Sequence, residues 1–234
     1  MLAMQDTLQH LTDRILQASQ SGQPLRLRGG GTKDFLGQSL QGEVLDTRAY
    51  SGILSYEPSE LVITVRGGTP LAEVEAALAE KGQSFAFEPP HFGEGATIGG
   101  MVAAGLSGPA RASVGTVRDF VLGARVINGK GEHLTFGGQV MKNVAGYDVS
   151  RLLAGSMGTL GVICEVSLKV LPQPVATATL RFELDQAAAL VRLNQWGGQP
   201  LPLSASAWWD GMLVLRLAGA RAAVDAACAT LGGE

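Results

Sequence analysis

Glycine-rich loops are the part of this chain whose residue types and spacing point most directly to chemistry. One loop reads Arg28-Gly29-Gly30-Gly31-Thr32-Lys33, and a second reads Thr97-Ile98-Gly99-Gly100 at the expected start of a helix. Consecutive backbone N–H groups in a loop or at a helix N-terminus attract phosphate through hydrogen bonds and the helix dipole. Two such loops are suited to share one pyrophosphate, although each loop taken alone is equally consistent with a tight turn.

Two common nucleotide-binding motifs are excluded. A P-loop needs GxxxxGK followed by Ser or Thr, but the Gly-Lys pair Gly129-Lys130 is followed by Gly131 in an expected hairpin turn. The Rossmann fingerprint GxGxxG is a poor match to the run that starts at Gly93, because its last glycine is missing. No βαβ unit with an acidic residue about 20 positions on surrounds that run. What remains is a set of peptide amides presented by glycines.

The composition narrows the class of protein. The 234 residues can bury one large core or two small ones, and 46% hydrophobic with 17% charged residues is typical of globular proteins. A net charge of −3 does not indicate a protein that binds nucleic acid. Glycine, with 32 residues, is close to double its usual share of about 7%. A fold tolerates such an excess where the main chain approaches a ligand closely or takes positive φ.

The cysteines and the N-terminus indicate an ordinary soluble protein. Cys164 falls in an expected strand and Cys228 in an expected helix, and neither is part of a CxxC pair. We interpret both as structural thiols of a reducing compartment and predict no metal site. The N-terminal segment carries Asp6, Asp13 and Arg14, so it fits neither a signal peptide nor a membrane span. No other run fits a span, and we expect a cytoplasmic location.

Short strands and helices alternate around the glycine loops. Apolar residues spaced by three and four predict a helix over 5–20. An N-cap at Thr69, Pro70 in the first helical position and a stop at Gly82 predict another helix. Strands are expected at 25–27, 61–65, 84–87, 121–127, 133–136 and 162–170, a helix at 97–105, and a short helix capped by Asp148 that runs to Leu153.

The sequence changes character beyond Pro174, where glycine becomes rarer. The order strand (175–184), helix (186–194), strand (205–209), strand (212–217) and helix (219–231) indicates a separate α+β unit. We therefore predict two domains, 1–172 and 173–234, with a boundary at the proline-containing linker 171–174. Because the chain ends directly after a helix, the sheet of the second domain looks unfinished.

Four stretches of the sequence resemble a known family of flavoproteins. In order they read RGGGTK, EPPHFGEGATIGGMVAAGLSGP, GTVRDFVLGARVINGKGE and KNVAGYDVSRLLAGSMGTLGVICEVSLKVLP. They look like the FAD-binding fold of vanillyl-alcohol oxidase and para-cresol methylhydroxylase (PCMH). More narrowly, they resemble the FAD-binding subunits of bacterial glycolate oxidases. The resemblance implies an α+β fold in which a two-subdomain, PCMH-type FAD-binding domain holds FAD between its subdomains and is followed by an incomplete α+β cap.

The resemblance also implies cofactor-binding residues. Those expected to wrap the FAD pyrophosphate are Gly29, Gly30, Gly31, Thr32 and Lys33, with a second set of amides from Thr97, Ile98, Gly99 and Gly100. Those expected near the flavin, along the cofactor and on the adenine side are Gly105 and Gly108, Gly115 and Asp119, and Gly161, Val162 and Ile163. Bulky substitutions at Gly30 or Gly99 are expected to block FAD while leaving the fold largely intact.

Two departures from the family pattern affect the chemistry. Some relatives attach the flavin covalently through a histidine in the first glycine loop, where this chain has Thr32, so we expect non-covalent FAD. Relatives that oxidise hydroxy acids often read Gly-Ser-Glu-Gly where this chain has Met157 in place of the glutamate. The function of that carboxylate is therefore absent here.

Catalysis by this chain alone is in question. Oxidation of a small 2-hydroxy acid needs a base for the hydroxyl proton, a cation for the carboxylate and a flavin to take the hydride. The family is expected to supply the first two from a histidine-rich, metal-binding cluster in its C-terminal domain, yet the histidines here are His10, His91 and His133. His91 alone precedes a glycine loop, and it is a weak candidate for a catalytic residue.

The resemblance thus implies one subunit of a glycolate oxidase or dehydrogenase complex that oxidises glycolate to glyoxylate, with hydride or electron transfer through FAD. The expected partners are a second, FAD-bearing subunit that performs the oxidation and an iron–sulfur subunit that takes the electrons onward. Peripheral attachment to the inner membrane through the complex stays open. Two alternatives are a stand-alone reductase of the same fold that uses NADPH and a flavin-free assembly subunit. Because the family's chains are longer, we expect this sequence to be a piece of the native protein.

Overall fold

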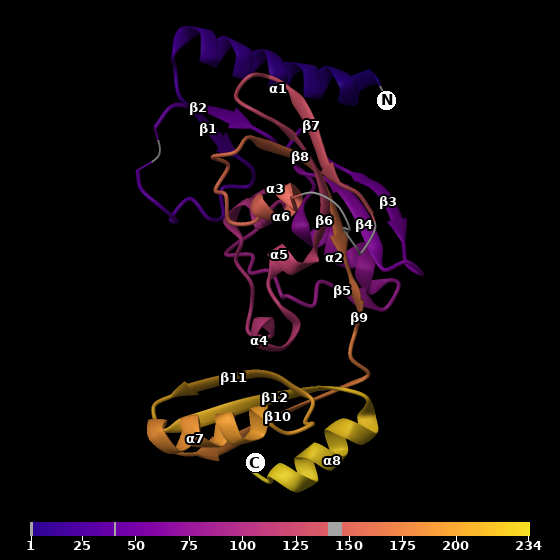
Figure 1. Cartoon of the computed structure of the whole chain (residues 1–234), viewed down its shortest axis with the longest axis vertical. Helices are drawn as coiled ribbons and strands as arrows, with labels where there is room; N and C mark the ends of the chain where they lie inside the picture. The colour runs from indigo at the N-terminus through magenta and orange to yellow at the C-terminus, as the bar shows by residue number, and fades with distance from the viewer. Residues whose placement is uncertain (1, 40, 140–146) are drawn as a thin grey trace. The chain divides into compact units, whose positions relative to one another are not determined.

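The computed structural model describes residues 2–39, 41–139 and 147–234, which form two compact units (Figure 1). The first unit contains Met1–Phe85, Pro89–Ser107 and Thr116–Leu171, and the second contains Ala86–Glu88, Gly108–Gly115 and Pro172–Glu234. Two short segments that precede residue 172 thus group with the C-terminal residues. The domain boundary near residue 172 stays a prediction.

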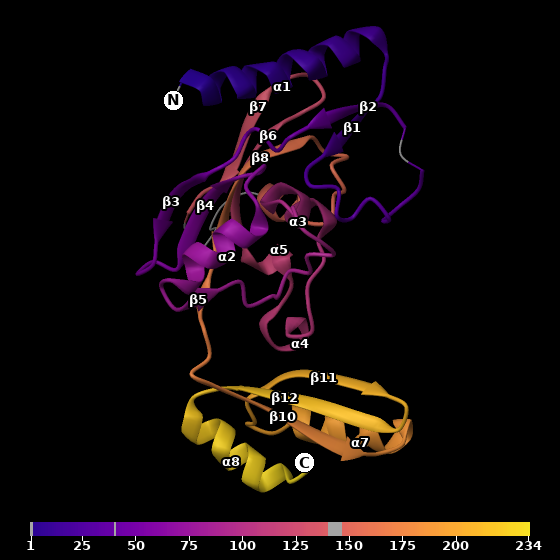
Figure 2. The same cartoon turned by 180° about the vertical axis from the view of Figure 1, so that it is seen from behind.

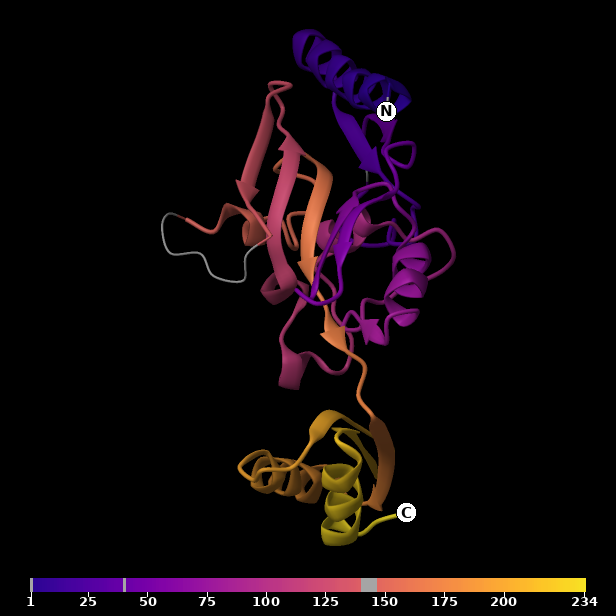
Figure 3. The same ribbon diagram turned by 90° about the vertical axis from the view of Figure 1, so that its right-hand side faces the viewer.

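An antiparallel sheet of five strands forms the centre of the first unit. The strand order is β3-β4-β8-β6-β7, and Figure 3 shows β8 in orange between its neighbours. The three inner strands are apolar and buried along most of their length, because both faces of the sheet are covered. The bounds are β3 (Ile53–Glu57), β4 (Val62–Arg66), β6 (Val121–Ile127), β7 (His133–Gly137) and β8 (Val162–Lys169).

The β6–β7 hairpin confirms one expected turn. Its strands are joined through Asn128, whose side chain accepts hydrogen bonds from the backbone N–H groups of Lys130 (2.9 Å) and Glu132 (3.0 Å). The prediction for residues 84–87 is wrong, since the strand β5 ends after two residues (Gln83–Ser84) and pairs with β9 (Leu171–Pro172). The chain turns away there, because the prolines that follow Glu88 cannot donate to a ladder.

The helices of the first unit begin and end largely where capping residues place them. In α3, Thr97 accepts a hydrogen bond from the N–H of Gly100 (3.2 Å), and Gly105 ends the helix in the left-handed conformation at φ 67°. Thr69, by contrast, does not cap α2: its hydroxyl donates to the carbonyl of Arg66 (2.7 Å), and Pro70 takes the N-cap position. The bounds are α1 (Leu2–Ser21), α2 (Leu71–Ala79), α3 (Ile98–Ala104), α5 (Val117–Phe120) and α6 (Val149–Leu152).

The helix α1 and a pair of parallel strands, β1 (Leu25–Arg28) and β2 (Glu43–Asp46), pack against one end of the large sheet. Their apolar side chains share a cluster with Ile127, Val162 and Cys164 of the sheet. A hydrogen bond of 2.9 Å between the Thr12 hydroxyl and Nε2 of His133 also joins α1 to β7. His133 therefore makes a structural contact with α1. It is distant in sequence from both glycine loops.

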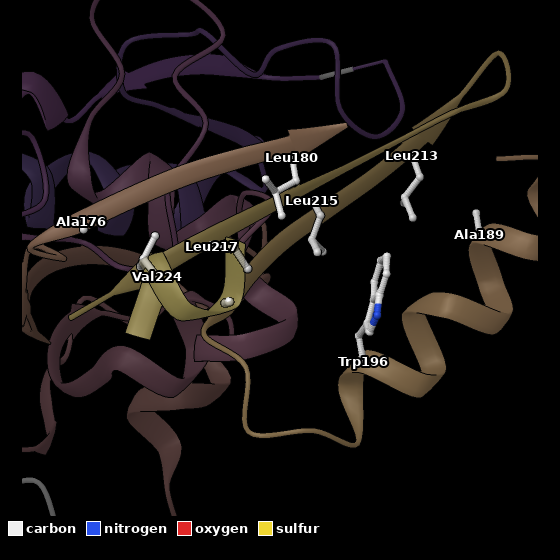
Figure 4. Close-up of a cluster of buried hydrophobic side chains, with 9 residues drawn as sticks. Ala176, Leu180, Ala189, Trp196, Leu213, Leu215, Leu217 and Val224 are labelled. Carbon is white, nitrogen blue, oxygen red and sulfur yellow. The ribbon is translucent and has the colours of Figure 1, made fainter. Parts of the chain in front are cut away.

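The second unit is a three-stranded antiparallel sheet with two helices packed on one face. The strand order is β10-β12-β11; alternate side chains of β12 are buried, and alternate side chains of β10 are buried or half-buried. Figure 4 shows Leu180, Leu213 and Leu215 of the strands directed toward Trp196 and Ala189 of α7. The bounds are β10 (Ala176–Glu183), α7 (Gln186–Gly197), β11 (Leu203–Trp209), β12 (Met212–Gly219), α8 (Arg221–Leu231) and, from the earlier segment, α4 (Arg111–Val114).

The order and type of the C-terminal elements agree with the pattern predicted from sequence, and the predicted α+β class is confirmed. Among the helices within the described ranges, none has both the length and the apolar character that crossing a bilayer requires.

Candidate functional site

A glycine-lined groove in the first unit is the candidate site. It consists of two adjoining hollows with about 430 and 650 Å³ of empty space, open solvent included. The loop after β1 forms one wall, and the first turn of α3 forms the other; Figure 2 shows this loop in indigo beside α3. The residues that line both hollows are Leu27, Arg28, Gly29, Gly100, Ala103 and Met157.

The groove brings together most of the residues predicted to bind a cofactor, from three separate regions of the sequence. They are Gly29, Gly30, Gly31, Thr32, Lys33, Thr97, Gly99, Gly100, Gly161, Val162 and Ile163. The β1 loop contributes the first five, α3 the next three and the start of β8 the last three. Their convergence supports a shared ligand, and their individual roles stay predictions.

The other predicted residues do not line the groove. Ile98 is fully buried, and Gly105 ends α3 against the backbone of Gly155. Gly108 and Gly115 belong to the second unit, where Gly115 follows α4 at φ 97°.

Asp119 also lies outside the groove and has a structural contact. Its carboxylate accepts hydrogen bonds from the backbone N–H (2.8 Å) and the hydroxyl (3.1 Å) of Thr116. The bond from the Thr116 N–H and the reciprocal bond from the N–H of Asp119 to the Thr116 side chain form the capping box of α5. The backbone hydrogen bond, more than the nearby arginines 118 and 151, lowers the pKa of Asp119 below its ordinary value. Asp119 therefore remains charged at the start of α5 over the whole physiological range of pH.

His91, the weak catalytic candidate, also lies outside the groove. Its Nε2 is 2.8 Å from Oε2 of Glu75 on α2, and both side chains are about one third exposed. It lines a separate hollow with Pro70 and the loop 93–96. None of the residues that line the two hollows of the groove is a histidine.

The first glycine loop presents unused donors. Within the described part of the chain, none of the backbone N–H groups of residues 29–33 donates a hydrogen bond to another residue. Polar backbone groups that are neither paired nor fully open to water cost free energy, so they favour an external acceptor. Lys33 adds a cation to this wall, and burial lowers the pKa of its ammonium group.

The second glycine loop differs in this respect. The N–H groups of Ile98 and Gly99 donate to the carbonyls of Thr69 (3.0 Å) and Gly67 (2.8 Å), and that of Gly100 donates to Thr97. These amides therefore have partners inside the chain, where we had expected free donors for phosphate. The loop 67–69 supplies those partners because its glycines let its main chain approach the start of α3 closely.

The structure corrects the expected effect of a bulky residue at Gly30. A Cβ atom there would overlap the carbonyl oxygen of Gly95, so Gly30 is needed for contact between two protein loops. A Cβ on Gly99 would come within 3.0 Å of the carbonyl oxygen of Gly67. Larger side chains at either position must therefore displace main chain, so they would disturb the protein itself as well as a bound ligand.

Several residues that line the groove were not among the predicted cofactor-binding residues, among them Arg28, Thr47 and Met157. Thr47 follows β2, a four-residue strand too short to be recognised by alternation. Met157 has φ 52°, unusual for a residue with a side chain, and its N–H donates to the carbonyl of Ala103 (2.9 Å). The substitution of the family's glutamate was the signal that marked this position.

Comparison with known proteins gives one family match and many relatives. Residues 2–137 match the model of the FAD binding domain family. The chain is 52% identical over all 234 residues to glycolate oxidase subunit GlcE of Escherichia coli K12, and it covers 67% of that protein. Over 159 residues it is 35% identical to a D-lactate dehydrogenase of Archaeoglobus fulgidus and 33% identical to glycolate oxidase subunit GlcD of Bacillus subtilis.

The chain thus spans about two thirds of the GlcE relative, and 35% and 34% of the other two. Among solved structures, an alkyldihydroxyacetonephosphate synthase aligns with 94% of this chain and 47% of its own, with a TM-score of 0.72 and 20% identity. That similarity shows a shared fold.

Proposed function

Because the chain belongs to the FAD binding domain family, we propose that it is the FAD-binding subunit of a glycolate oxidase or dehydrogenase complex that oxidises glycolate to glyoxylate. The identity of 52% to GlcE over the whole chain is the observation that carries this proposal. The relatives with lower identity act on 2-hydroxy acids by their names, which supports the same class of substrate.

The residues of the groove fit a bound FAD. The free N–H groups of residues 29–33 and the ammonium group of Lys33 are suited to the negative charge of a pyrophosphate. Gly161, Val162 and Ile163 line the hollow at the other end of the groove, where we assign the adenine. The first loop is the main phosphate site in this assignment, since the amides at the start of α3 already have partners.

FAD would supply the redox chemistry of such a complex, since a flavin can accept a hydride from a 2-hydroxy acid. The contribution of this chain is to bind the dinucleotide, to neutralise its phosphates and to exclude water from one side of it. Non-covalent attachment of FAD agrees with a chain that only binds the dinucleotide. Thr32 has no ring nitrogen, and neither Cys164 nor Cys228 lines the groove.

A division of labour between subunits follows from the positions of the histidines. His133 is bonded to Thr12, His91 is paired with Glu75, and none of the residues that line the groove is a histidine. We therefore assign the oxidation of glycolate to a second, FAD-bearing subunit and the onward transfer of electrons to an iron–sulfur subunit. The identity of this chain to both GlcE and GlcD supports a complex built from two related flavoprotein chains.

A spectral titration tests the proposal. The purified protein should bind FAD with the shifted visible spectrum of a bound flavin, and acid precipitation should release all of the yellow chromophore into solution. Bleaching by NADPH would favour the reductase of the same fold, and a failure to bind FAD would favour the flavin-free assembly subunit.

Turnover with an artificial dye acceptor tests the division of labour. Since a positioned base contributes on the order of 10² to 10⁴ in rate, the FAD-loaded subunit alone should oxidise glycolate slower than the mixture with its partners by about that factor. Rapid turnover by the isolated subunit would contradict the assignment, and His91→Ala would then be the first variant to examine.

A further inference from the structure

The carboxylate of Asp34 holds two arginines of β1 beside the phosphate loop. Its Oδ2 lies 2.8 Å from Nε of Arg28 and 2.7 Å from Nη2 of Arg26. The two arginines are two residues apart on a strand, so they extend from the same face of β1. The glycine loop reverses the chain so that Asp34 reaches them, and the N–H of Asp34 closes this turn on the carbonyl of Gly31 (3.2 Å).

This contact fixes where the guanidinium group of Arg28 lies. The group occupies the position that a Cβ atom of Gly31 would take, directly against the loop whose N–H groups are unused. Asp34 bonds the Nε of Arg28, and the two Nη atoms have no hydrogen-bond partner among the described residues. Arg28 lines both hollows of the groove, whereas Arg26 lines neither.

The charges of the groove are few. Its charged lining residues are Arg28, Lys33 and Asp34. The hydrogen bonds and charges of the two arginines outweigh partial burial and keep the pKa of Asp34 below its ordinary value, so its carboxylate is ionised at neutral pH. A negative group beside a site for a dianionic pyrophosphate opposes binding through its charge, unless its hydrogen bonds contribute more than its charge costs.

We propose that Asp34 is a positioning residue for the cofactor: it orients Arg28 so that the free edge of the guanidinium group faces the phosphates bound in the 29–33 loop. A guanidinium group presents its donors in a fixed planar fork, so its value for phosphate depends on its orientation. The inference rests on the proposed FAD site and extends it to two residues that the predicted cofactor set did not include.

The variant Asp34→Asn separates positioning from charge, because the two effects have opposite signs. Loss of the negative charge alone should strengthen the binding of FAD. Loss of the oriented Arg28 should weaken it by about tenfold, as expected when one charge-assisted contact is lost. We expect the weaker binding, measured by quenching of FAD fluorescence. ADP, measured by its displacement of FAD, should show the same loss, and riboflavin, which has no phosphate, should show none.

Asp46→Asn is the matched control. Asp46 is the register partner of Arg28 in the β1–β2 pair, but its carboxylate binds Arg48 at 2.6 Å. The control removes a nearby negative charge without releasing Arg28, so FAD binding should stay equal or become tighter. Arg28→Lys, which keeps the charge and loses the fork, should reproduce the loss seen for Asp34→Asn.

The outcomes distinguish this inference from the proposed function. Wild-type protein that binds FAD beside an Asp34→Asn variant that binds it equally or more tightly overturns the positioning role alone. Wild-type protein that binds neither FAD nor ADP overturns both. Circular dichroism and the thermal midpoint of each variant show whether it is folded. If Asp34→Asn is unfolded, the test rests on Arg28→Lys: weaker FAD binding by folded Arg28→Lys supports the inference, and unchanged binding counts against it.

Discussion

The structures of the two units of the molecule depend on different kinds of contact. In the first unit, the groove depends on main chain that approaches main chain: Gly30 meets Gly95, and Gly99 meets Gly67. In the second unit, the core depends on side-chain volume, with Trp196 and Phe182 at 5.1 Å between ring centroids and leucines of β12 around them. The first arrangement is sensitive to any added atom, and the second is sensitive to atoms removed.

This difference bears on how each region can change. A leucine core accepts other apolar residues of similar volume at small cost in the free energy of unfolding. A contact between two peptide groups has no such substitutes, because only glycine lacks a Cβ atom. A binding groove built in this way keeps its shape but leaves few allowed sequences. A core of side chains leaves many.

The largest expected effect concerns the second unit. Trp196→Ala removes a side chain that is 6% exposed and should lower the free energy of unfolding by about 3–5 kcal/mol. FAD binding in the first unit should persist, because the groove does not depend on this core. Urea unfolding followed by circular dichroism measures the first effect, and FAD titration measures the second.

Trp209→Ala provides the control for Trp196→Ala. Trp209 is 56% exposed on β11, so its loss should change stability by about 0.5 kcal/mol or less. Equal effects of the two substitutions, or loss of FAD binding by folded Trp196→Ala, would remove the distinction between the units.

The next effect concerns the first unit. Gly30→Ala adds one carbon that must push the Gly95 loop away, and we expect a loss of about 3 kcal/mol together with loss of FAD binding. Gly129→Ala is the matched control, since a Cβ atom there meets nothing within 4 Å. Thermal unfolding of both variants decides the question: similar midpoints would show that the two loops separate readily, and the groove would then be less sensitive to added atoms than we infer.

The smallest effect tests a cap in the first unit that depends on charge. Asp119→Ala removes the carboxylate of the α5 capping box and should cost about 1 kcal/mol at pH 7. The folded protein lowers the pKa of Asp119, so this stabilisation is complete above the ordinary carboxyl pKa and is lost as pH falls through the lower, folded value. The difference between wild type and variant should therefore shrink below about pH 4. A difference independent of pH would assign the effect to packing.

Much of the fold could be predicted from local signals. Thr97 and Gly105 mark the two ends of α3, and Asp148 accepts a hydrogen bond from the N–H of Arg151 (3.3 Å) at the start of α6, as expected. Such signals act within three or four residues, so a single sequence contains them in full. Thr69 shows where such local prediction fails, because its hydroxyl forms hydrogen bonds with Arg66 and Gly52 and does not cap the helix that follows.

The candidate site was predicted less completely. The glycines of the groove were found because their density is unusual, but Arg28 was not, since an arginine at the end of a strand has no distinctive pattern. Its contact with Asp34 depends on the path of the intervening loop. The pairing of Ile98 and Gly99 with the 67–69 loop joins segments about 30 residues apart and was likewise beyond local reasoning.

The place of β8 in the sheet has a consequence for synthesis of the chain. The hairpins β3–β4 and β6–β7 can form from local contacts, but β8, which lies between them, is translated last of the five strands. Until then each hairpin presents an open edge, and the strand that pairs with β4 is synthesised only about a hundred residues after it. Pairing over such a separation is slow, so the two hairpins should stay unjoined in the nascent chain until β8 has been synthesised.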